Sequence, residues 1–370
     1  MDYNYQKPVS EYKAFLGRRA LVSKIYARIG AGRPQSVSIV GDLKVGKSSL
    51  LWYLAHEETK KTMLSKPEEY IYLFIPCRAD EQLTLESFTR IVYDISRKYT
   101  DPDGERDKSP YLYNYFKNLV ESLHKQNKKI ILFLDDFNLV TQNTAFPLEF
   151  FSFLRSLANN YNLAYITTSY EDLQKLCVSK DIEESPFFNI FTNMSLRGFD
   201  PDEIDTLFKP SDSNNGKDIR SEQEYLVHLV GTIPFPLQMA CHYLLTIKND
   251  HQPLDNEQRK QIESLLAEKL YAYHQQLWSG MEENHRHILT NLASGLRILG
   301  AQGYLVRDLE KKNYIDSSNG KNTIASMLFQ NFICDINHST NTVREKSSNL
   351  WQPLLWLKKI ISGLNVRKQL

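Results

Sequence analysis

Eight consecutive residues constrain the fold of this chain more than any other segment, because they match the pattern GxxxxGK[ST] without a mismatch. They are Gly41, Asp42, Leu43, Lys44, Val45, Gly46, Lys47 and Ser48. A short β-branched run at 35–40 precedes them, and the helical spacing of SSLLWYLAHEE begins with their last residue. The pattern requires a strand before it and a helix after it. We therefore predict a phosphate-binding loop rather than a chance octapeptide in a glycine-containing turn.

The residue types of this loop suit the binding of a polyphosphate. A side chain at Gly41 or Gly46 would obstruct the backbone N–H groups that turn inward around the phosphate oxygens. Lys47 supplies a positive charge to the terminal phosphates, and Ser48 offers a hydroxyl to Mg²⁺, which prefers hard oxygen ligands. Ser49, the next residue, is included among the expected nucleotide contacts. Because no NKxD-like guanine-binding motif is visible, we expect ATP or ADP with Mg²⁺ as cofactors.

Four further strands are expected after the loop. Near-continuous apolar runs lie at 70–76, 129–134 and 163–168, and a weaker run lies at 193–196. Apolar residues at successive positions indicate strands that are buried on both faces. Helical patterns lie between them, for example at 83–99 and 150–159. Strands that alternate with helices predict an α/β fold with a parallel sheet.

An acidic pair, Asp135 and Asp136, ends the apolar run IILFLDDF. The carboxyl ends of strands in open parallel sheets face the ligand crevice. Asp135 is the expected Mg²⁺ partner, and Asp136 is positioned to orient or deprotonate an attacking water. The alternative is that the pair caps a following helix, because Asp is a good N-cap residue. The phosphate-binding loop upstream favours the catalytic interpretation.

Together these features resemble the additional-strand class of P-loop NTPases, and within it the AAA-like STAND ATPases (signal-transduction ATPases with numerous domains) and their archaeal-type relatives. The loop and the acidic pair stand where this class carries its Walker A and Walker B motifs. Phe15-Leu16-Gly17-Arg18 is similar to the FxGR segment that these families place near the nucleotide base, which implies contacts from Gly17 and Arg18. The resemblance extends over residues 10–250.

Two further segments agree with the resemblance. Thr168 or Ser169, at the end of the fourth run, would be the sensor of the γ-phosphate. Gly231-Thr232-Ile233-Pro234 is similar to the GxP segment of a helical lid, which implies that Pro234 contacts the nucleotide. The resemblance also implies the strand order 5-1-4-3-2, which places Lys47 and Asp135 at one crevice.

The sequence departs from the family pattern at two positions. Arg19 stands where relatives carry an acid after FxGR, and Asp136 is one methylene shorter than the usual catalytic Glu. A retracted base slows hydrolysis, which suits a switch better than a motor. A neighbouring subunit's arginine commonly completes such a site, and Arg155 and Arg197 are the candidates. The alternative, ordinary surface arginines, is favoured because most arginines are exposed.

The resemblance and the composition of the segments predict four parts. They are a nucleotide-binding domain at 1–200, a helical lid at 201–275, a winged-helix-like domain at 276–340 and a basic tail at 341–370. Three short helices with a hairpin are expected in the third part. Its basic residues, Arg297, Arg307, Lys311, Lys312 and Lys321, are interspersed with Asp308, Glu310 and Asp316. The acids oppose phosphate attraction, so a protein or intramolecular contact is favoured over DNA.

Charge and cysteine content exclude several classes. Lys and Arg number 45 against 44 Asp and Glu, so no chain-wide field attracts nucleic acid or membrane. The four cysteines form no CxxC, so neither a zinc site nor a disulfide framework is indicated. His285 and His287 stand two apart on a predicted helix, which disfavours a metal pair. No signal or membrane-spanning pattern is visible, and we expect a soluble, cytoplasmic protein.

These observations predict an ATP-binding, Mg²⁺-dependent switch that hydrolyses ATP slowly and controls assembly or a partner protein in signalling or defence. Its expected partners are nucleotide and either copies of itself or another protein. Two alternatives stay open. The first is a DNA-binding AAA-like ATPase of the replication-initiator or transposition-regulator type, and the second is a nucleotide-bound scaffold without useful turnover.

Overall fold

The computed structural model describes residues 3, 5–78, 83–100, 112–209, 218–248, 253–296, 298, 302–317 and 320–337. The expected basic tail at 341–370 and Arg297 lie outside the described residues. The chain divides into two compact units, Met1–Gln223 with Thr232–Pro253, and Glu224–Gly231 with Leu254–Leu370. Each unit is described by itself. Among the described residues, no helix combines the length and apolarity that a membrane crossing needs.

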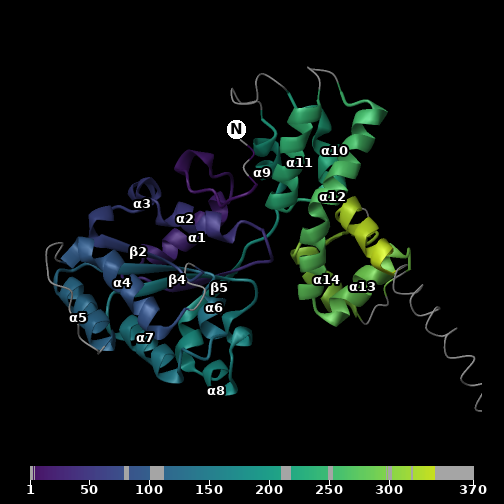
Figure 1. Ribbon diagram of the computed structural model, residues 1–370. Helices are drawn as coiled ribbons and strands as arrows, with labels where there is room; N and C mark the ends of the chain where they lie inside the picture. The colour runs from purple at the N-terminus through teal and green to yellow at the C-terminus, as the bar shows by residue number, and fades with distance from the viewer. Residues whose placement is uncertain are drawn as a thin grey trace, which may run out of the picture. The chain divides into compact units, whose positions relative to one another are not determined.

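A five-stranded parallel sheet forms the centre of the first unit (Figure 1). Its strands are β1 (Ser36–Val40), β2 (Tyr70–Pro76), β3 (Lys129–Asp135), β4 (Leu163–Ser169) and β5 (Phe191–Ser195). They lie in the order β2-β3-β4-β1-β5. This order confirms the expected 5-1-4-3-2 arrangement, and each expected strand is present within two residues of its predicted start. The α/β fold class is confirmed.

Burial explains why the strand signals differed in strength. All seven residues of β4 are buried, because β4 lies inside the sheet with helices on both faces. The edge strand β5 has no buried residue and an alternating, half-exposed pattern, so its sequence carries a weaker apolar signal. The structure starts β5 at Phe191, two residues before the expected 193.

Helices cover both faces of the sheet, and most of them match expected helical patterns. The helices of this region are α1 (Arg19–Ile29), α2 (Lys47–Ala55), α3 (Glu57–Met63), α4 (Leu85–Thr100), α5 (Leu112–Lys125), α6 (Asn138–Thr141), α7 (Leu148–Asn160) and α8 (Lys180–Glu183). Short 3-10 turns are η1 (Tyr12–Ala14), η2 (Pro67–Glu69), η3 (Leu173–Leu176) and η4 (Pro186–Ile190). The loop that matters for function joins β1 directly to α2.

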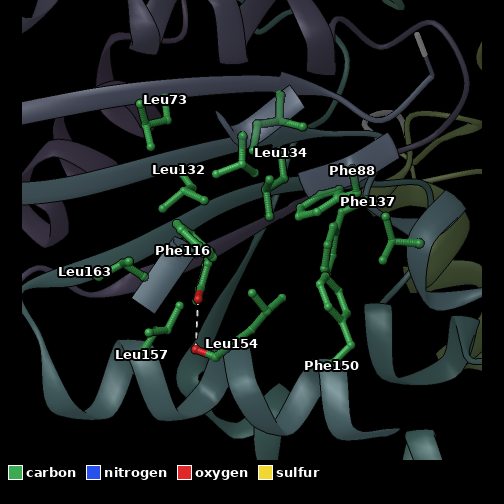
Figure 2. Close-up of a cluster of buried hydrophobic side chains, with 14 of the residues drawn as sticks. Leu73, Phe88, Phe116, Leu132, Leu134, Phe137, Phe150, Leu154, Leu157 and Leu163 are labelled. Carbon is green, nitrogen blue, oxygen red and sulfur yellow. Dashed lines mark hydrogen bonds between the residues drawn. The ribbon is translucent and has the colours of Figure 1, made fainter. Parts of the chain in front are cut away.

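The strands divide the core of the first unit into two apolar clusters. On one face, Leu132 of β3 packs in a cluster with Phe116 of α5 and Leu154 of α7 (Figure 2). On the other face, Ile131 and Phe133 of β3 pack with residues of α1 and α2. Alternate residues of one strand thus enter opposite clusters. This two-sided burial is the physical reason for the near-continuous apolar run, and it fixes the end of β3 firmly in place.

Two helices of the expected lid also belong to the first unit. They are α9 (Pro201–Leu207) and α11 (Pro234–Ile247), and the turn η6 (Arg220–Glu222) lies between them in the chain. Asp200 and Glu203 form a reciprocal capping box at the start of α9, which satisfies backbone donors that a helix leaves free. Pro234 occupies the first turn of α11, where a missing N–H costs nothing.

The second unit is mostly helical. It contains nearly all of α10 (Gln223–Val230), α12 (Asn256–Gly280), α13 (Glu283–Ala293), α14 (Gly303–Lys311) and a helical segment at 327–337. Two short antiparallel strands, β6 (Ile315–Asp316) and β7 (Thr323–Ile324), form a hairpin before that last segment. Three helices and a hairpin are therefore present where they were expected. A winged-helix arrangement of these elements stays a prediction.

Candidate functional site

The loop between β1 and α2 has the backbone shape that its two glycines allow. A Cβ on Gly41 would come 2.6 Å from the Leu196 carbonyl oxygen and 2.9 Å from Val45 Cγ1, both too close for real contacts. Gly46 has φ +98°, a conformation that L side chains rarely adopt, and it forms the N-cap of α2. One glycine is therefore needed for close packing and the other for the turn into the helix.

The Lys47 side chain lies across the mouth of this loop. Its Nζ donates to the carbonyl oxygens of Gly41 at 2.7 Å and Asp42 at 2.9 Å. Burial lowers the pKa of Lys47, and the carboxylates of Asp136, Asp42 and Asp135 oppose this shift. Both hydrogen-bond acceptors are neutral carbonyls, so the ammonium can exchange them for an anionic oxygen without leaving a charged partner unpaired.

The acidic pair lies at the carboxyl end of β3 and is joined to β4 through one hydroxyl. Thr168 Oγ1 donates to Asp135 Oδ1 at 2.6 Å and accepts from the backbone N–H of Asp136 at 2.7 Å. Burial raises the pKa of Asp135, while hydrogen bonds from Thr168 and Ser48 oppose that shift. The helix-cap alternative does not describe the pair, because the N-cap of α6 is Phe137 and no side chain caps it.

Asp136 adopts a left-handed backbone conformation, with φ +54°. Its carboxylate is held by Arg78, a residue that we did not predict from the sequence. Arg78 Nε donates to Asp136 Oδ2 at 2.9 Å, and the Arg78 side chain is 76% exposed. Arg78 follows β2, the neighbour of β3, so both residues reach the same edge of the sheet. The sequence does show a basic residue just after the second strand. That position predicts a contact with Asp136 only when the second and third strands are known to be neighbours.

These groups surround one pocket of about 390 Å³, a volume within the range typical of small-molecule sites. Its phosphate side consists of residues 43–49 with Arg78, Asp135 and Asp136. The rest of the lining consists of residues 5–9, 14–16, Arg18, Phe199, Pro234, Phe235 and Gln238. We call this second set the base-side wall, because the FxGR resemblance predicts the nucleotide base there. It combines the N-terminal segment with residues around α9 and α11, of which only Arg18 and Pro234 were predicted to contact the nucleotide.

The contacts of the base-side wall are specific. The backbone N–H of Val9 donates to Ser49 Oγ at 3.0 Å, which ties the N-terminal segment to α2. The rings of Tyr5 and Phe235 meet edge to face, with centroids 6.1 Å apart. Lys44 of the phosphate-binding loop lies with its Nζ 5.1 Å from the Phe235 ring centroid. Phe235 therefore contacts both the N-terminal segment and the loop.

The remaining predicted residues lie around the pocket rather than in its lining. Gly41 and Asp42 bind Lys47 through their carbonyls, and Thr168 lies buried behind the acidic pair. The Ser169 hydroxyl donates to the Glu171 carbonyl at 2.6 Å instead of facing Asp135. Gly17 packs against Glu203 beside the wall.

The two candidate arginines also lie outside the lining of this pocket. Arg155 is on α7 and has a buried Nε without a hydrogen-bond partner, whereas Arg197 is exposed after β5. In the second unit, His285 lies beside Glu282 and Asp308, whereas His287 contacts Asn291. The two histidines thus have different surroundings.

A family model and several solved structures match this chain. The family described as novel STAND NTPase 2 matches residues 31–294, more than two thirds of the chain. The Walker-type ATPase of Pyrococcus abyssi has a similar structure, with a TM-score of 0.60 and 17% identity over 90% of this chain and 99% of that one. The ORC2 protein of Aeropyrum pernix, solved as ADPNP–ADP complexes, also has a similar structure. Its TM-score is 0.53, and it is 12% identical over 92% of this chain and 98% of that one. At such identities the likeness establishes a shared fold. No curated protein matches the sequence.

Proposed function

Because the chain belongs to the novel STAND NTPase 2 family, we propose that it is an ATP-binding, Mg²⁺-dependent switch with slow hydrolysis. The switch would control assembly or a partner protein in signalling or defence. The single observation that carries the proposal is the complete phosphate-binding loop, folded between β1 and α2 with Lys47 at its mouth and the acidic pair beside it. This arrangement has the parts that phosphoryl transfer needs: a cradle, a cation and an acid pair.

The loop would hold the phosphates through backbone N–H groups and Lys47. The N-terminus of α2 adds the positive end of a helix dipole. Lys47 would move from the Gly41 and Asp42 carbonyls to the terminal phosphates when the nucleotide binds. Phe235, Phe199 and the N-terminal segment would cover the base and sugar, because they line the part of the pocket that the loop and the acidic pair do not.

The chemistry of Ser48 and Asp135 fits Mg²⁺. Both are oxygen donors at one edge of the pocket, and Mg²⁺ in nucleotide sites takes one or two protein oxygens while phosphates and waters complete its shell. Held by Ser48 and Asp135, Mg²⁺ would supply positive charge that offsets the negative charge developing on the phosphates in the transition state. The hydrogen bond from buried Thr168 holds Asp135 in one orientation, so the carboxylate is ready for such a ligand.

Asp136 would act as the base that activates water. Its short side chain is held by Arg78 through Oδ2, so one of its two carboxylate oxygens is engaged in an ion pair and the movement of the group toward a water is restrained. This restraint, together with the missing methylene, supports slow turnover. Thr168 would sense the γ-phosphate indirectly, through Asp135, because its hydroxyl proton is already donated to the Asp135 carboxylate. Ser169 would contribute through its backbone, since its carbonyl accepts from Gly41 N–H.

The division into residues 1–200, 201–275, 276–340 and 341–370 is retained as a proposal for the moving parts. The lid and the winged-helix-like part would have two arrangements, and ATP would bind one of them more tightly. Only such a difference in affinity allows a ligand to shift the populations of two conformations. In a homo-oligomer, Arg155 and Arg197 are the candidates for an arginine that completes a neighbouring copy's site, with ordinary structural arginines as the favoured interpretation.

A protein partner is favoured over DNA by the charges of α14. Lys312 Nζ lies 3.2 Å from Asp308 Oδ2, and His285 Nε2 lies 3.3 Å from the same carboxyl group. Part of the local positive charge is thereby neutralised within the unit. Steady-state ATPase measurements with and without random duplex DNA test this choice. Stimulation by DNA that disappears as salt rises would instead support the DNA-binding alternative.

Titration with a fluorescent ATP analogue in Mg²⁺ tests the proposed function. Lys47→Ala should abolish binding, because it removes the ammonium group that lies at the mouth of the loop and would pair with the terminal phosphates. Lys24→Ala, on the exposed face of α1, is the matched control and should bind as the unaltered protein does. Equal affinity in the Lys47 variant, or no binding by the unaltered protein, would overturn the proposal.

A further inference from the structure

A buried ion pair joins the base-side wall to the lid helix α9. Glu203, in the first turn of α9, lies 3.0 Å from Arg18 Nη1 through its Oε2, and its Oε1 accepts from the Arg18 backbone N–H. Both side chains are only 9% exposed. The same carboxylate accepts from Asp200 N–H at 3.0 Å as half of the capping box. One carboxyl group therefore serves its own helix and a turn 185 positions earlier in the chain.

The turn that Glu203 holds has an unusual backbone. Gly17 has φ +75° and Arg18 has φ +60°, so two successive residues are left-handed. A Cβ on Gly17 would lie 2.5 Å from Glu203 Oε1. The glycine is needed because the carboxylate packs directly on it. The left-handed Arg18, which is costly for a residue with a side chain, aims its backbone N–H at that carboxylate.

The Arg18 side chain is held on three sides. Its Nη1 also donates to the Gly198 carbonyl at 2.9 Å, and its guanidinium carbon lies 4.7 Å from the Phe199 ring centroid. Burial lowers the pKa of Arg18, while Glu203 and Asp200 oppose the shift. A buried guanidinium of this kind needs its carboxylate partner, because an unpaired buried charge is strongly unfavourable.

Arg18 and Phe199 both line the pocket, whereas Glu203 does not. We propose that Glu203 is a positioning residue for the nucleotide: through Arg18 it fixes the base-side wall and couples the order of α9 to nucleotide occupancy. The inference rests on the proposed function, and it names the lid contact through which that function would be regulated. Nucleotide bound against the wall would stabilise the ion pair, and the pair in turn would stabilise the first turn of α9.

The test compares Glu203→Gln with Asp200→Ala in the full-length protein. Glu203→Gln keeps the size and an acceptor oxygen but loses the charge that pairs with Arg18. Asp200→Ala removes the other half of the capping box and leaves the ion pair intact. Binding of the fluorescent ATP analogue should weaken by about tenfold or more in Glu203→Gln, because removal of one partner of a buried ion pair leaves the Arg18 charge uncompensated. It should stay near the original value in Asp200→Ala.

Hydrogen exchange of residues 201–207 is measured with and without the ATP analogue. If Glu203 had only a structural role, its substitution would not change how much protection α9 gains when the analogue binds. The unaltered protein and Asp200→Ala should gain protection there on binding, and Glu203→Gln should lose that gain even when nucleotide saturates it. Arg18→Met combined with Glu203→Gln should bind no more weakly than the weaker single variant, because the two changes disrupt one interaction.

Two outcomes overturn the inference alone. One is that Glu203→Gln binds the analogue with the original affinity and the original protection of α9. The other is that Glu203→Gln and Asp200→Ala weaken binding equally, because the effect would then come from the helix cap. A thermal unfolding curve identifies any variant that fails to fold. In that case Arg18→Lys, which keeps the positive charge, is measured in place of the unfolded variant, and it should bind the analogue more tightly than Arg18→Met. Failure of the unaltered protein to bind is a separate result, which rejects the proposed function.

Discussion

The two sides of the pocket are built in opposite ways. On the phosphate side, the contacts of Lys47 reach carbonyls only five and six positions away in the chain. On the base side, contacts join residues 40 positions apart at Val9 and Ser49, and 185 apart at Arg18 and Glu203. The loop of the phosphate side is set by a contiguous motif between a strand and a helix, whereas Arg78 and the acidic pair reach it from the neighbouring strands β2 and β3. The base-side wall exists only after distant segments have packed together.

This difference predicts how each side responds to change. A local motif concentrates its function in a few atoms, so single substitutions there should have large effects. A wall assembled from several segments spreads its contacts, so most single substitutions should cost little. The Arg18–Glu203 pair is the exception on the base side, because it is buried and charged.

The largest effect is expected at Asp136. Asp136→Asn should lower the rate of ATP hydrolysis by about 10²–10⁴-fold, the usual contribution of a general base, because the amide does not accept a proton from water. Binding of ATP should persist, since the lysine and the loop are unchanged. Phosphate release under saturating ATP measures the rate. Asp181→Asn, on the exposed surface of α8, is the control. An unchanged rate of hydrolysis in Asp136→Asn would show that Asp136 is not the general base.

The next largest effect is expected from Gly41→Ala. Its Cβ would meet the Leu196 carbonyl oxygen, so the loop must shift, and overpacking of this kind implies a loss of about ten- to hundredfold in ATP affinity. Gly32→Ala is the matched control, because no atom lies within 4 Å of its added Cβ. ATP titration of both variants checks the prediction. Similar affinities in the two would mean that the loop tolerates a different shape.

A smaller effect is expected from Thr168→Val. The substitution removes both hydrogen bonds to the acidic pair at nearly constant volume, and should lower the free energy of unfolding by about 1–3 kcal/mol. The Mg²⁺ dependence of ATP binding should also weaken, because Asp135 loses the bond that orients it. Thermal unfolding and Mg²⁺ titration measure the two effects. Thr168→Ser keeps the hydroxyl and should restore most of both, and a serine variant as poor as valine would contradict this role.

The smallest effect is expected on the base side, at Phe235. Phe235→Ala removes one aromatic contact with Tyr5 and the contact with Lys44, and should weaken ATP binding by only about two- to tenfold. Leu296→Ala, on an exposed residue of the second unit, is the control. ATP titration decides the comparison. If Phe235→Ala abolished binding as Lys47→Ala is expected to do, the contrast between the two sides would be lost.

The parts of the fold that follow local rules were predictable from the sequence. The strand order was implied by resemblance and confirmed, and the apolar runs of β2, β3 and β4 identified strands because burial on both faces demands such runs. The phosphate-binding loop was readable because its glycines, lysine and serine are contiguous. Asp135 was placed by its position at a strand end.

The base-side wall and Arg78 could not be predicted in the same way. Arg78 has no motif around it, and its contact with Asp136 depends on β2 and β3 being neighbours. Glu203 was visible only as part of an ordinary helix start, DPDE, which gives no indication that it also holds Gly17 and Arg18. Ser169 illustrates the converse limit, because strand alternation and the following turn direct its hydroxyl to Glu171.

The attachment of the N-terminal segment has a practical consequence for anyone who prepares this protein. Tyr3 bonds to the Leu207 carbonyl, Tyr5 to the Tyr243 hydroxyl and Val9 to Ser49, so the described part of the N-terminal segment is anchored at three places. A shortened version that starts at Ser10 keeps the whole sheet yet lacks residues 5–9 of the base-side wall. Residues 5–9 therefore belong in every clone used for nucleotide assays.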